Sequence, residues 1–202
     1  MPYEDLPELH TERLMLRHSR PGMEQAMVDF LVANEAGHFD RWGPPASPAY
    51  FTCAFWAGKL QQEIDEFRRD IAVRFVLQHR ADDSRIVGSV NYSQVFRGAF
   101  QACYLGYRIA RDREGKGLMR EALQAANSYM FAERRIHRIM ANHIPENERS
   151  AGLLARLGFE REGIARNYLF INGAWRDHVL TSLTHPGYDP AWITPQGTPP
   201  SR

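Results

Sequence analysis

Residues 107–120, YRIARDREGKGLMR, join a strand-like segment to an amphipathic helix through a turn that contains Gly115 and Gly117. A glycine adopts positive φ without steric cost and lets the backbone approach another molecule closely. After the turn, apolar residues recur every three or four positions, the period of a helix with one buried face. They are Leu118, Met119, Ala122, Leu123, Ala126, Tyr129 and Met130. This segment therefore predicts a strand, a tight turn and a helix that packs on the sheet.

Strand and helix patterns cover most of the remaining chain. Strand-like runs predict further strands at 13–17, 71–79, 85–94, 102–109 and 138–144. The turn residues RADDS, at 80–84, separate the second of these strands from the third. Residues 21–70 are mainly helical in pattern, and the turn-rich stretch 43–48 interrupts them.

Two elements near the end of the chain carry local signals. Leu153, Leu154 and Leu157 form the apolar stripe of a short helix, and Gly158 follows where a C-terminal cap belongs. Segments 167–171 and 174–183 flank Asn172-Gly173, a pair typical of a type I′ turn between antiparallel strands. The chain is therefore expected to close with a hairpin.

The order of these elements indicates the fold class. Strands come first in a run and then alternate with helices, which predicts a mixed α/β layer protein and not a doubly wound nucleotide-binding fold. The 202 residues fit one domain, and we place it at residues 1–184. Residues 185–202 are rich in Pro and Gly, so we expect a tail without packed elements.

Composition excludes several function classes. The chain has 25 basic and 24 acidic side chains and a net charge of +1, so it lacks the basic face typical of nucleic-acid binding. Cys53 and Cys103 match neither a disulfide framework nor a metal site, and Cys103 is read as a small buried residue. The N-terminus has no signal-peptide pattern, and no apolar run approaches the length of a membrane span. We expect a cytoplasmic protein without a metal ion or a membrane partner.

The glycine turn is a candidate diphosphate site. The first amides of the following helix have no partner within the helix, and the helix dipole favours an anion beside them. Positive charge gathers nearby, on Arg111, Arg113, Lys116 and Arg120. Neither GxxxxGK[ST] nor GxGxxG occurs here, which argues against the common nucleotide loops. From the turn alone, a plain connecting loop with a solvated basic face is an equally open interpretation.

EGKGLM after YRIA resembles the coenzyme A pyrophosphate loop of the GNAT acetyltransferase superfamily, Q/R-x-x-G-x-G/A. Glu114 and Met119 depart from that pattern, whereas Gly115-Lys116-Gly117 keeps it. A second GNAT-like element, NERS at 147–150, precedes LLARLGFEREG. Within the superfamily, the segments TERLMLR, FRGAFQACYLGY, GKGLMREAL, HRIMANHIPENERS and WRDHVLT resemble the bacterial ribosomal-protein-alanine N-acetyltransferases of the RimJ type. This resemblance covers about Thr11 to Thr184, in order.

The resemblance implies a fold and an activity. The fold would be a central mixed, largely antiparallel twisted sheet with helices on both faces. The reaction would be direct transfer of acetyl from acetyl-CoA, in a ternary complex, to the N-terminal alanine of a small-subunit ribosomal protein. Two other functions stay open: a GNAT enzyme that acts on a small-molecule amine or a lysine side chain, and a non-catalytic coenzyme A-binding or ribosome-assembly module. Residues 21–70 and the FRGAF stretch at 96–100 would shape the acceptor site.

The resemblance also implies which residues bind the cofactor. In the family, the backbone of the strand before the loop accepts the pantetheine arm, and Tyr107, Arg108 and Ile109 match that position. The loop and the second element complete the expected cofactor site: Glu114, Gly115, Lys116, Gly117, Leu118, Met119, Asn147 and Ser150. Asn147 has a second reading as a helix cap, and the side chains of Tyr107 and Ile109 have a second reading as buried sheet residues.

The resemblance identifies the catalytic residues less completely than the cofactor residues. The backbone amide of Ile109 is our candidate oxyanion donor, and Ser150 is a candidate donor to the departing thiolate. Leu154 and Asn142 stand where relatives carry an acid and a base. His143 is a candidate base that reaches the amine only if a bulge turns it, because neighbouring strand residues face opposite sides. An α-amine with a pKa near 8 is roughly a tenth neutral at pH 7, so a weak base or a water relay suffices.

Overall fold

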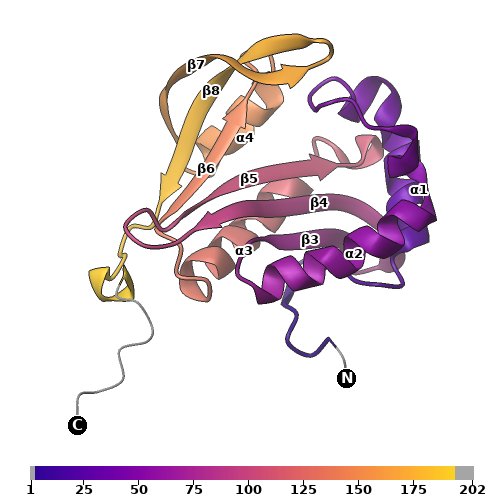
Figure 1. Ribbon diagram of the computed structural model, residues 1–202, viewed down its shortest axis with the longest axis horizontal. Helices are drawn as coiled ribbons and strands as arrows, with labels where there is room; N and C mark the ends of the chain where they lie inside the picture. The colour runs from indigo at the N-terminus through magenta and orange to yellow at the C-terminus, as the bar shows by residue number, and fades with distance from the viewer. Residues whose placement is uncertain (1–2, 194–202) are drawn as a thin grey trace.

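The computed structural model describes residues 3–193, which form one eight-stranded sheet in the order β1-β2-β3-β4-β5-β6-β8-β7 (Figure 1). Every neighbouring pair is antiparallel except β5 and β6, which are parallel. The strands are β1 (Glu8–His10), β2 (Leu14–His18), β3 (Val73–His79), β4 (Asp82–Phe96), β5 (Ala102–Ile109), β6 (Arg138–His143), β7 (Glu160–Ile171) and β8 (Ala174–Thr184). The helices are α1 (Glu24–Asn34), α2 (Cys53–Arg68), α3 (Leu118–Ala132) and α4 (Glu148–Arg156).

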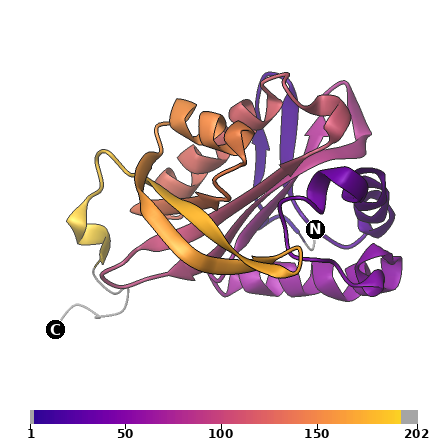
Figure 2. The ribbon, with the colours of Figure 1, turned by 90° about the horizontal axis from the view of Figure 1, so that it is seen from above.

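Helices cover both faces of the sheet, as Figure 2 shows with α1 and α2 on one side and α3 and α4 on the other. The alternation along β3 explains this arrangement. Phe75 packs edge-on against Tyr129 of α3 with their ring centroids 5.7 Å apart. Its neighbour Val76 points to the other face, where it joins a cluster with Trp56 and Leu60 of α2. The predicted mixed, largely antiparallel sheet with helices on both faces is confirmed.

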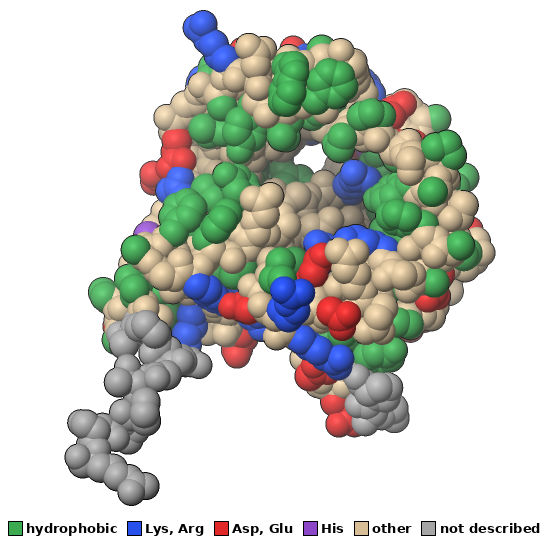
Figure 3. All heavy atoms as spheres, viewed as in Figure 1, with side chains coloured by type: hydrophobic (Ala, Val, Ile, Leu, Met, Phe, Trp, Pro, Cys, Tyr) green, Lys and Arg blue, Asp and Glu red, His purple; other side chains and the backbone are tan. Residues whose placement is uncertain are grey.

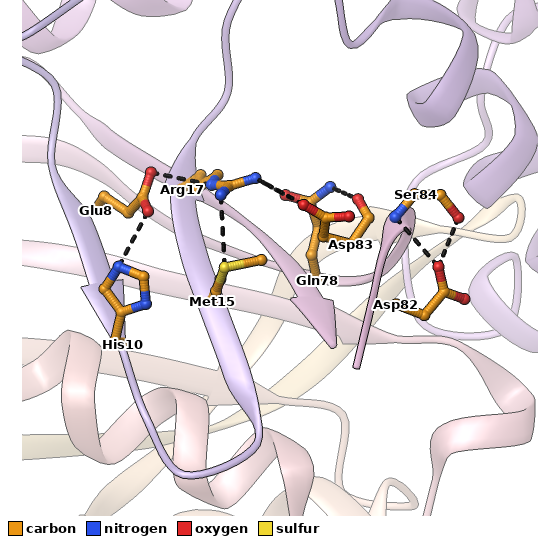
Figure 4. A network of polar contacts seen from close by, with 8 residues as sticks. All are labelled: Glu8, His10, Met15, Arg17, Gln78, Asp82, Asp83 and Ser84. Atoms are coloured by element: carbon orange, nitrogen blue, oxygen red, sulfur yellow. Dashed lines mark hydrogen bonds and ion pairs between the residues drawn. The ribbon is translucent and has the colours of Figure 1, made fainter. Parts of the chain in front are cut away.

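Polar contacts tie the first three strands together at the edge of the sheet (Figure 4). Arg17 of β2 donates from Nε to Glu8 of β1 at 3.0 Å and from Nη1 to Gln78 of β3 at 3.3 Å. Glu8 also lies 3.0 Å from Nε2 of His10. Because Glu8 and His10 are exposed and Arg17 is only partly buried, each ion pair contributes at most about 1 kcal/mol. The contacts therefore fix strand alignment more than they add stability.

The local sequence signals are confirmed. Gly115 and Gly117 have φ values of 70° and 76°, so the turn before α3 requires glycine at both positions. Asn172 and Gly173 have φ values of 52° and 76°, as a type I′ turn demands. Gly158 has a φ of 85° directly after the last turn of α4, which is the expected C-terminal cap.

Three predictions need correction. The turn between β3 and β4 is confined to Arg80 and Ala81, because β4 already starts at Asp82. β7 starts at Glu160 and not at Asn167. The sequence did not indicate its first half, because most of its side chains are exposed on both faces and give no alternation of apolar and polar residues. β1 was not predicted, because three residues are too few to show the alternation of apolar and polar residues that indicates a strand.

The tail also differs from expectation where the structure describes it. Residues Pro190–Ile193 form η4, a short 3-10 helix, and Trp192 contacts the rings of His185 and Tyr188. Residues 194–202 lie outside the described residues, and the domain boundary at 184 stays a prediction. Among residues 3–193, no helix is long and apolar enough to cross a membrane.

Candidate active site

The sheet opens between β5 and β6. The two strands pair only at Ala102–Tyr104 against Arg138–Met140. Beyond that point β5 stays with β4 as far as Ile109, and β6 stays with β8 as far as His143. The two strands therefore diverge, and each presents one backbone edge to the gap.

The edge of β5 offers its backbone to a ligand. The amide of Ala110 donates to the carbonyl of Val87 in β4 at 2.8 Å. Because backbone groups of successive strand residues point to opposite edges, the N–H and C=O of Ile109 point into the gap. His38 confirms the direction, since its Nε2 lies 2.9 Å from the carbonyl oxygen of Ile109. The amide of Ile109 thus faces the gap, and its role as an oxyanion donor stays a prediction.

A positively charged helix start lies at one end of the gap. Gly117 is the N-cap residue of α3, and the first amides of that helix have no partner within it. Arg113 and Arg120 line the cleft beside it. Arg111 also lines the cleft, and its guanidinium donates to the carbonyl of Ala36. Lys116 does not line the cleft: its Nζ donates to the carbonyl of Asp112 at 2.8 Å.

Glu114 would repel a diphosphate if it stood alone. Its carboxylate forms an ion pair with Arg149 of α4, and the ring Nδ1 of His38 lies 3.9 Å away. Arg149 itself is largely exposed, with 76% of its side chain accessible. The pair keeps the local charge balanced where the family's usual residue would be Gln or Arg.

The start of α4 forms the facing wall. Asn147 is its N-cap residue, with Oδ1 accepting from the amide of Ser150 at 3.1 Å. The cap reading is therefore confirmed, and it leaves the Nδ2 donor of Asn147 for another contact. Leu154, which takes the place of the family's tyrosine, is buried at 1% exposure.

A second hydroxyl lies beside Ser150. The oxygen of Tyr107 is 2.7 Å from Oγ of Ser150, and both residues line the cleft. Burial raises the pKa of Tyr107 to about 12, outweighing the hydrogen bond to Ser150. The phenol therefore stays protonated at neutral pH and can donate to Ser150. The sequence shows only a strand aromatic here, so no sequence signal indicated this role.

These elements enclose a cleft of about 910 Å³. Figure 3 shows a hollow that passes through the molecule beside the β7–β8 hairpin. The predicted cofactor residues that line the cleft are Tyr107, Arg108, Ile109, Glu114, Gly115, Gly117, Leu118, Met119, Asn147 and Ser150. The sheet brings them together from β5, from the turn before α3 and from α4, and an open route through the sheet suits a reaction between two substrates.

The two faces of the sheet divide the cleft. Ile139 and Ala141 of β6 belong to the core cluster with α3, and His143 has the same parity. β6 pairs with β8 in unbroken register, so no bulge turns His143 to the other face. Asn142 lies on that other face, where its Nδ2 donates to the hydroxyl of Tyr168 at 3.2 Å. The predicted base His143 thus lies on the cofactor side.

The segment between α1 and α2 lies within residues 21–70, which were expected to shape the acceptor site, and it lines the cleft with His38, Phe39, Trp42, Gly43 and Pro44. His178 of β8 also lines the cleft, and the sequence did not single it out. The FRGAF stretch connects β4 to β5 at the far end of β5 and does not line it. The expectation that FRGAF shapes the acceptor site therefore has no support from the cleft and stays a prediction.

Cys103 takes no part in the cleft. Its side chain is fully buried, and burial raises the pKa of its thiol to about 12. A neutral, enclosed thiol is a poor nucleophile, which agrees with the reading of Cys103 as a packing residue. Glu162 has a structural role: it pairs with Arg138 of β6 and accepts from Ser182 of β8.

Comparison with known proteins matches this site to one family. A sequence model described as the acetyltransferase (GNAT) domain matches residues 13–160. The [ribosomal protein uS5]-alanine N-acetyltransferase of Escherichia coli strain K12 is 45% identical over 185 residues, which cover 90% of this chain and 93% of that protein.

Solved structures agree with the sequence comparison. The ribosomal-protein-S5-alanine acetyltransferase of Vibrio fischeri superposes with a TM-score of 0.87 at 36% identity, covering 91% of this chain and all of that one. Mycobacterium smegmatis RimJ, solved in complex with CoA-disulfide, has a TM-score of 0.79 at 28% identity and covers 89% of this chain and 86% of its own.

Proposed function

The chain belongs to the GNAT family of acetyltransferases, and we propose that it transfers acetyl from acetyl-CoA to the N-terminal alanine of a small-subunit ribosomal protein. The single observation that carries this proposal is the gap between β5 and β6, with the glycine turn of α3 at one end. A gap with unpaired backbone edges suits an extended pantetheine arm, and a helix N-terminus suits a diphosphate. The ribosomal acceptor rests on the likeness to the enzymes named above.

The cofactor half of the cleft has groups for each part of the transfer. The turn at Gly115 and Gly117 would hold the diphosphate, and the edge of β5 would align the pantetheine arm. The amide of Ile109 would stabilise the oxyanion that forms when the amine attacks the thioester carbonyl. The C–N bond forms in this attack, and the C–S bond breaks when the tetrahedral intermediate collapses.

The departing thiolate needs a proton. Ser150 is the candidate donor, and the hydroxyl of Tyr107 at 2.7 Å can replace the proton that Ser150 gives up. This pair takes the part that a tyrosine at the position of Leu154 plays in relatives. The donor therefore comes from β5 and the start of α4, one turn earlier along the helix.

The acceptor half agrees with a free N-terminus as the substrate. An α-amine is far easier to deprotonate than a lysine side chain, because its pKa is about 8 and not about 10.4. No buried carboxylate lines the acceptor side of the cleft within residues 3–193. An acceptor on a ribosomal protein also places the reaction in the cytoplasm.

Acetyl-CoA turnover with synthetic peptides tests the proposal. A peptide with the N-terminal sequence of the small-subunit protein uS5 should be acetylated, and the same peptide with a blocked N-terminus and an internal lysine should not. Changing the first residue to a bulky one should lower kcat/KM. Turnover of the blocked lysine peptide alone would identify a lysine acetyltransferase. Coenzyme A binding without turnover of any amine would indicate a binding module.

A further inference from the structure

We infer that His178 is the base that takes a proton from the acceptor amine, an inference that rests on the proposed function. Asn142 and Leu180 lie directly opposite each other in the β6–β8 pair, so their side chains share a face. His178 is two residues from Leu180 along β8 and therefore lies on that same face. It also lines the cleft.

The surroundings of His178 define its tautomer. Its Nδ1 lies 3.1 Å from the carbonyl oxygen of Arg176, which can only accept a hydrogen bond. Nδ1 therefore carries the proton, and Nε2 has a free lone pair. The structure shows no hydrogen-bond partner for Nε2 among residues 3–193. A lone pair without a protein partner, on a side chain that lines the cleft, is what a base needs.

Neighbouring side chains hold the ring in place. Only 3% of His178 is exposed, and its ring centroid lies 5.4 Å from that of Tyr168 in β7. The hydroxyl of Tyr168 accepts from Asn142, so three strands contribute to one polar cluster. A packed ring with a defined tautomer meets the requirement for positional accuracy in a catalytic group.

The charged and titratable groups around His178 come from several elements. Tyr168 of β7 faces the ring, and burial raises its pKa, so it stays neutral. On β8 itself, Arg176 pairs with Glu146 at 2.9 Å, and Asp177 accepts from the amide of Asn167 at 2.9 Å. From β5, Arg108 lines the same cleft. The cations and anions beside the ring on β8 thus have partners of their own.

The protons that the amine loses and the proton that the thiolate gains follow separate routes. The acceptor ammonium loses one proton to Nε2 of His178, which passes it to solvent as the imidazolium relaxes. The neutral amine then attacks the thioester carbonyl, and the C–N bond forms. The tetrahedral intermediate loses the second proton from its nitrogen to bulk water, and its collapse breaks the C–S bond. The thiolate receives a proton from Ser150, which Tyr107 replaces from solvent. Base and acid therefore act on opposite faces of the sheet.

His143 provides a matched control. Its Nδ1 lies 2.9 Å from the carbonyl oxygen of Ile144, so it has the same tautomer as His178, and it is similarly buried and lines the same cleft. It differs in lying on the opposite face of the sheet. His143→Gln and His178→Gln therefore compare two equivalent imidazoles that differ in the side of the sheet they occupy.

The experiment measures kcat/KM with the uS5 peptide from pH 6 to pH 9, together with thermal unfolding of each variant. His178→Gln should lower kcat/KM about tenfold at pH 7, where roughly a tenth of the amine is neutral, and by less than about twofold at pH 9. The pH dependence of the variant should rise to a plateau near the pKa of the amine, about 8. His143→Gln should change kcat/KM by the same factor at pH 7 and at pH 9, because His143 lies on the opposite face of the sheet from the acceptor amine.

Several outcomes would overturn the inference. A loss in His178→Gln that is the same at pH 7 and pH 9 would mean that the residue only supports the structure. Wild-type kcat/KM in His178→Gln, or a larger pH-dependent loss in His143→Gln, would exclude His178 as the base. If His178→Gln does not fold, His178→Asn is measured over the same pH range, and the same pH-dependent loss of kcat/KM is expected. Absence of turnover by the wild type refutes the proposed function itself and is recognised before any variant is measured.

Discussion

Replacing Glu121 with alanine should loosen the turn that is proposed to hold the diphosphate. The carboxylate lies in the first turn of α3 and accepts from Oγ1 of Thr11 at 2.6 Å, from the amide of Arg13 at 2.8 Å and from Nε of Arg13 at 2.7 Å. Arg13 also donates from Nη1 to the carbonyl of Lys116 at 3.0 Å. Glu121 thus holds Arg13, and Arg13 holds the glycine turn.

The expected cost follows from these contacts. Hydrogen bonds to a charged group contribute about 1.5–3 kcal/mol each. Glu121 is only 17% exposed, but Arg13 is 40% exposed, and water recovers part of the loss. We therefore expect Glu121→Ala to lower the free energy of unfolding by about 2–3 kcal/mol, which lowers Tm by about 4–12 °C in a domain of this size. Coenzyme A should bind about threefold to tenfold more weakly.

The effect should depend on pH. Burial alone would raise the pKa of Glu121, but the Thr11 hydroxyl and the Arg13 backbone and guanidinium outweigh it and hold the pKa below its usual value of 4.5. A carboxyl with a lowered pKa stabilises the fold fully above its unfolded pKa, and this contribution is lost as pH falls through the folded pKa. The stability difference between wild type and Glu121→Gln should therefore stay constant near neutrality and close below about pH 4.

Thermal unfolding by circular dichroism and calorimetric titration with coenzyme A measure both effects. Glu133→Gln, at the exposed C-terminal end of α3, is the matched control and should change neither quantity. If Glu121→Ala melts within about 1 °C of the wild type and binds coenzyme A equally well, Glu121 does not stabilise the glycine turn through Arg13. If Glu121→Ala loses stability but its folded fraction binds coenzyme A as tightly as the wild type, the stability prediction holds and the proposed link between Glu121 and the glycine turn is refuted.

Further variants test the wall of the cleft formed by β5 and α4. Asn147→Asp keeps the oxygen that caps α4 but removes the Nδ2 donor, so Tm should stay unchanged while KM for acetyl-CoA rises about tenfold; equal KM values would leave Asn147 as a cap only. Ser150→Ala should lower kcat about tenfold or more, and Tyr107→Phe by less, as measured in steady-state assays. The double variant should resemble Ser150→Ala, because Tyr107 acts through Ser150; fully additive losses would show that the two hydroxyls act independently.

Local features of the site were predictable from the sequence because short-range sterics decide them. Gly115 and Gly117 lie in the left-handed region because the chain must turn there within a few residues, and only glycine does so at low cost. Asn172-Gly173 and Gly158 follow the same rule. The apolar period of α3 likewise depends only on residues within a few turns of each other. These signals, with the family resemblance, were enough to place the cofactor residues on one strand, one turn and one helix start.

Long-range pairing determined the rest of the site, and no short window of sequence records it. β6 pairs with β8 while β7 takes the sheet edge, so β5 and β6 separate after Tyr104 and open the cleft. The tertiary structure also brings residues distant in sequence into contact: His38 reaches the carbonyl of Ile109, and the hydroxyl of Tyr107 reaches Ser150.

The choice between His143 and His178 depends on the same long-range pairing. Each is a histidine in a strand. The sequence indicated His143, because it adjoins Asn142, and it did not single out His178. The register of the β6–β8 pair determines which histidine faces the acceptor side, because a shift of one residue moves every side chain of a strand to the opposite face. The sequence by itself determined the turns and the helices, and with the family resemblance it predicted the residues of the proposed cofactor site. Only the packed sheet decided which side chains face the acceptor, because the free energy that selects a register comes from the whole buried core and from no single segment.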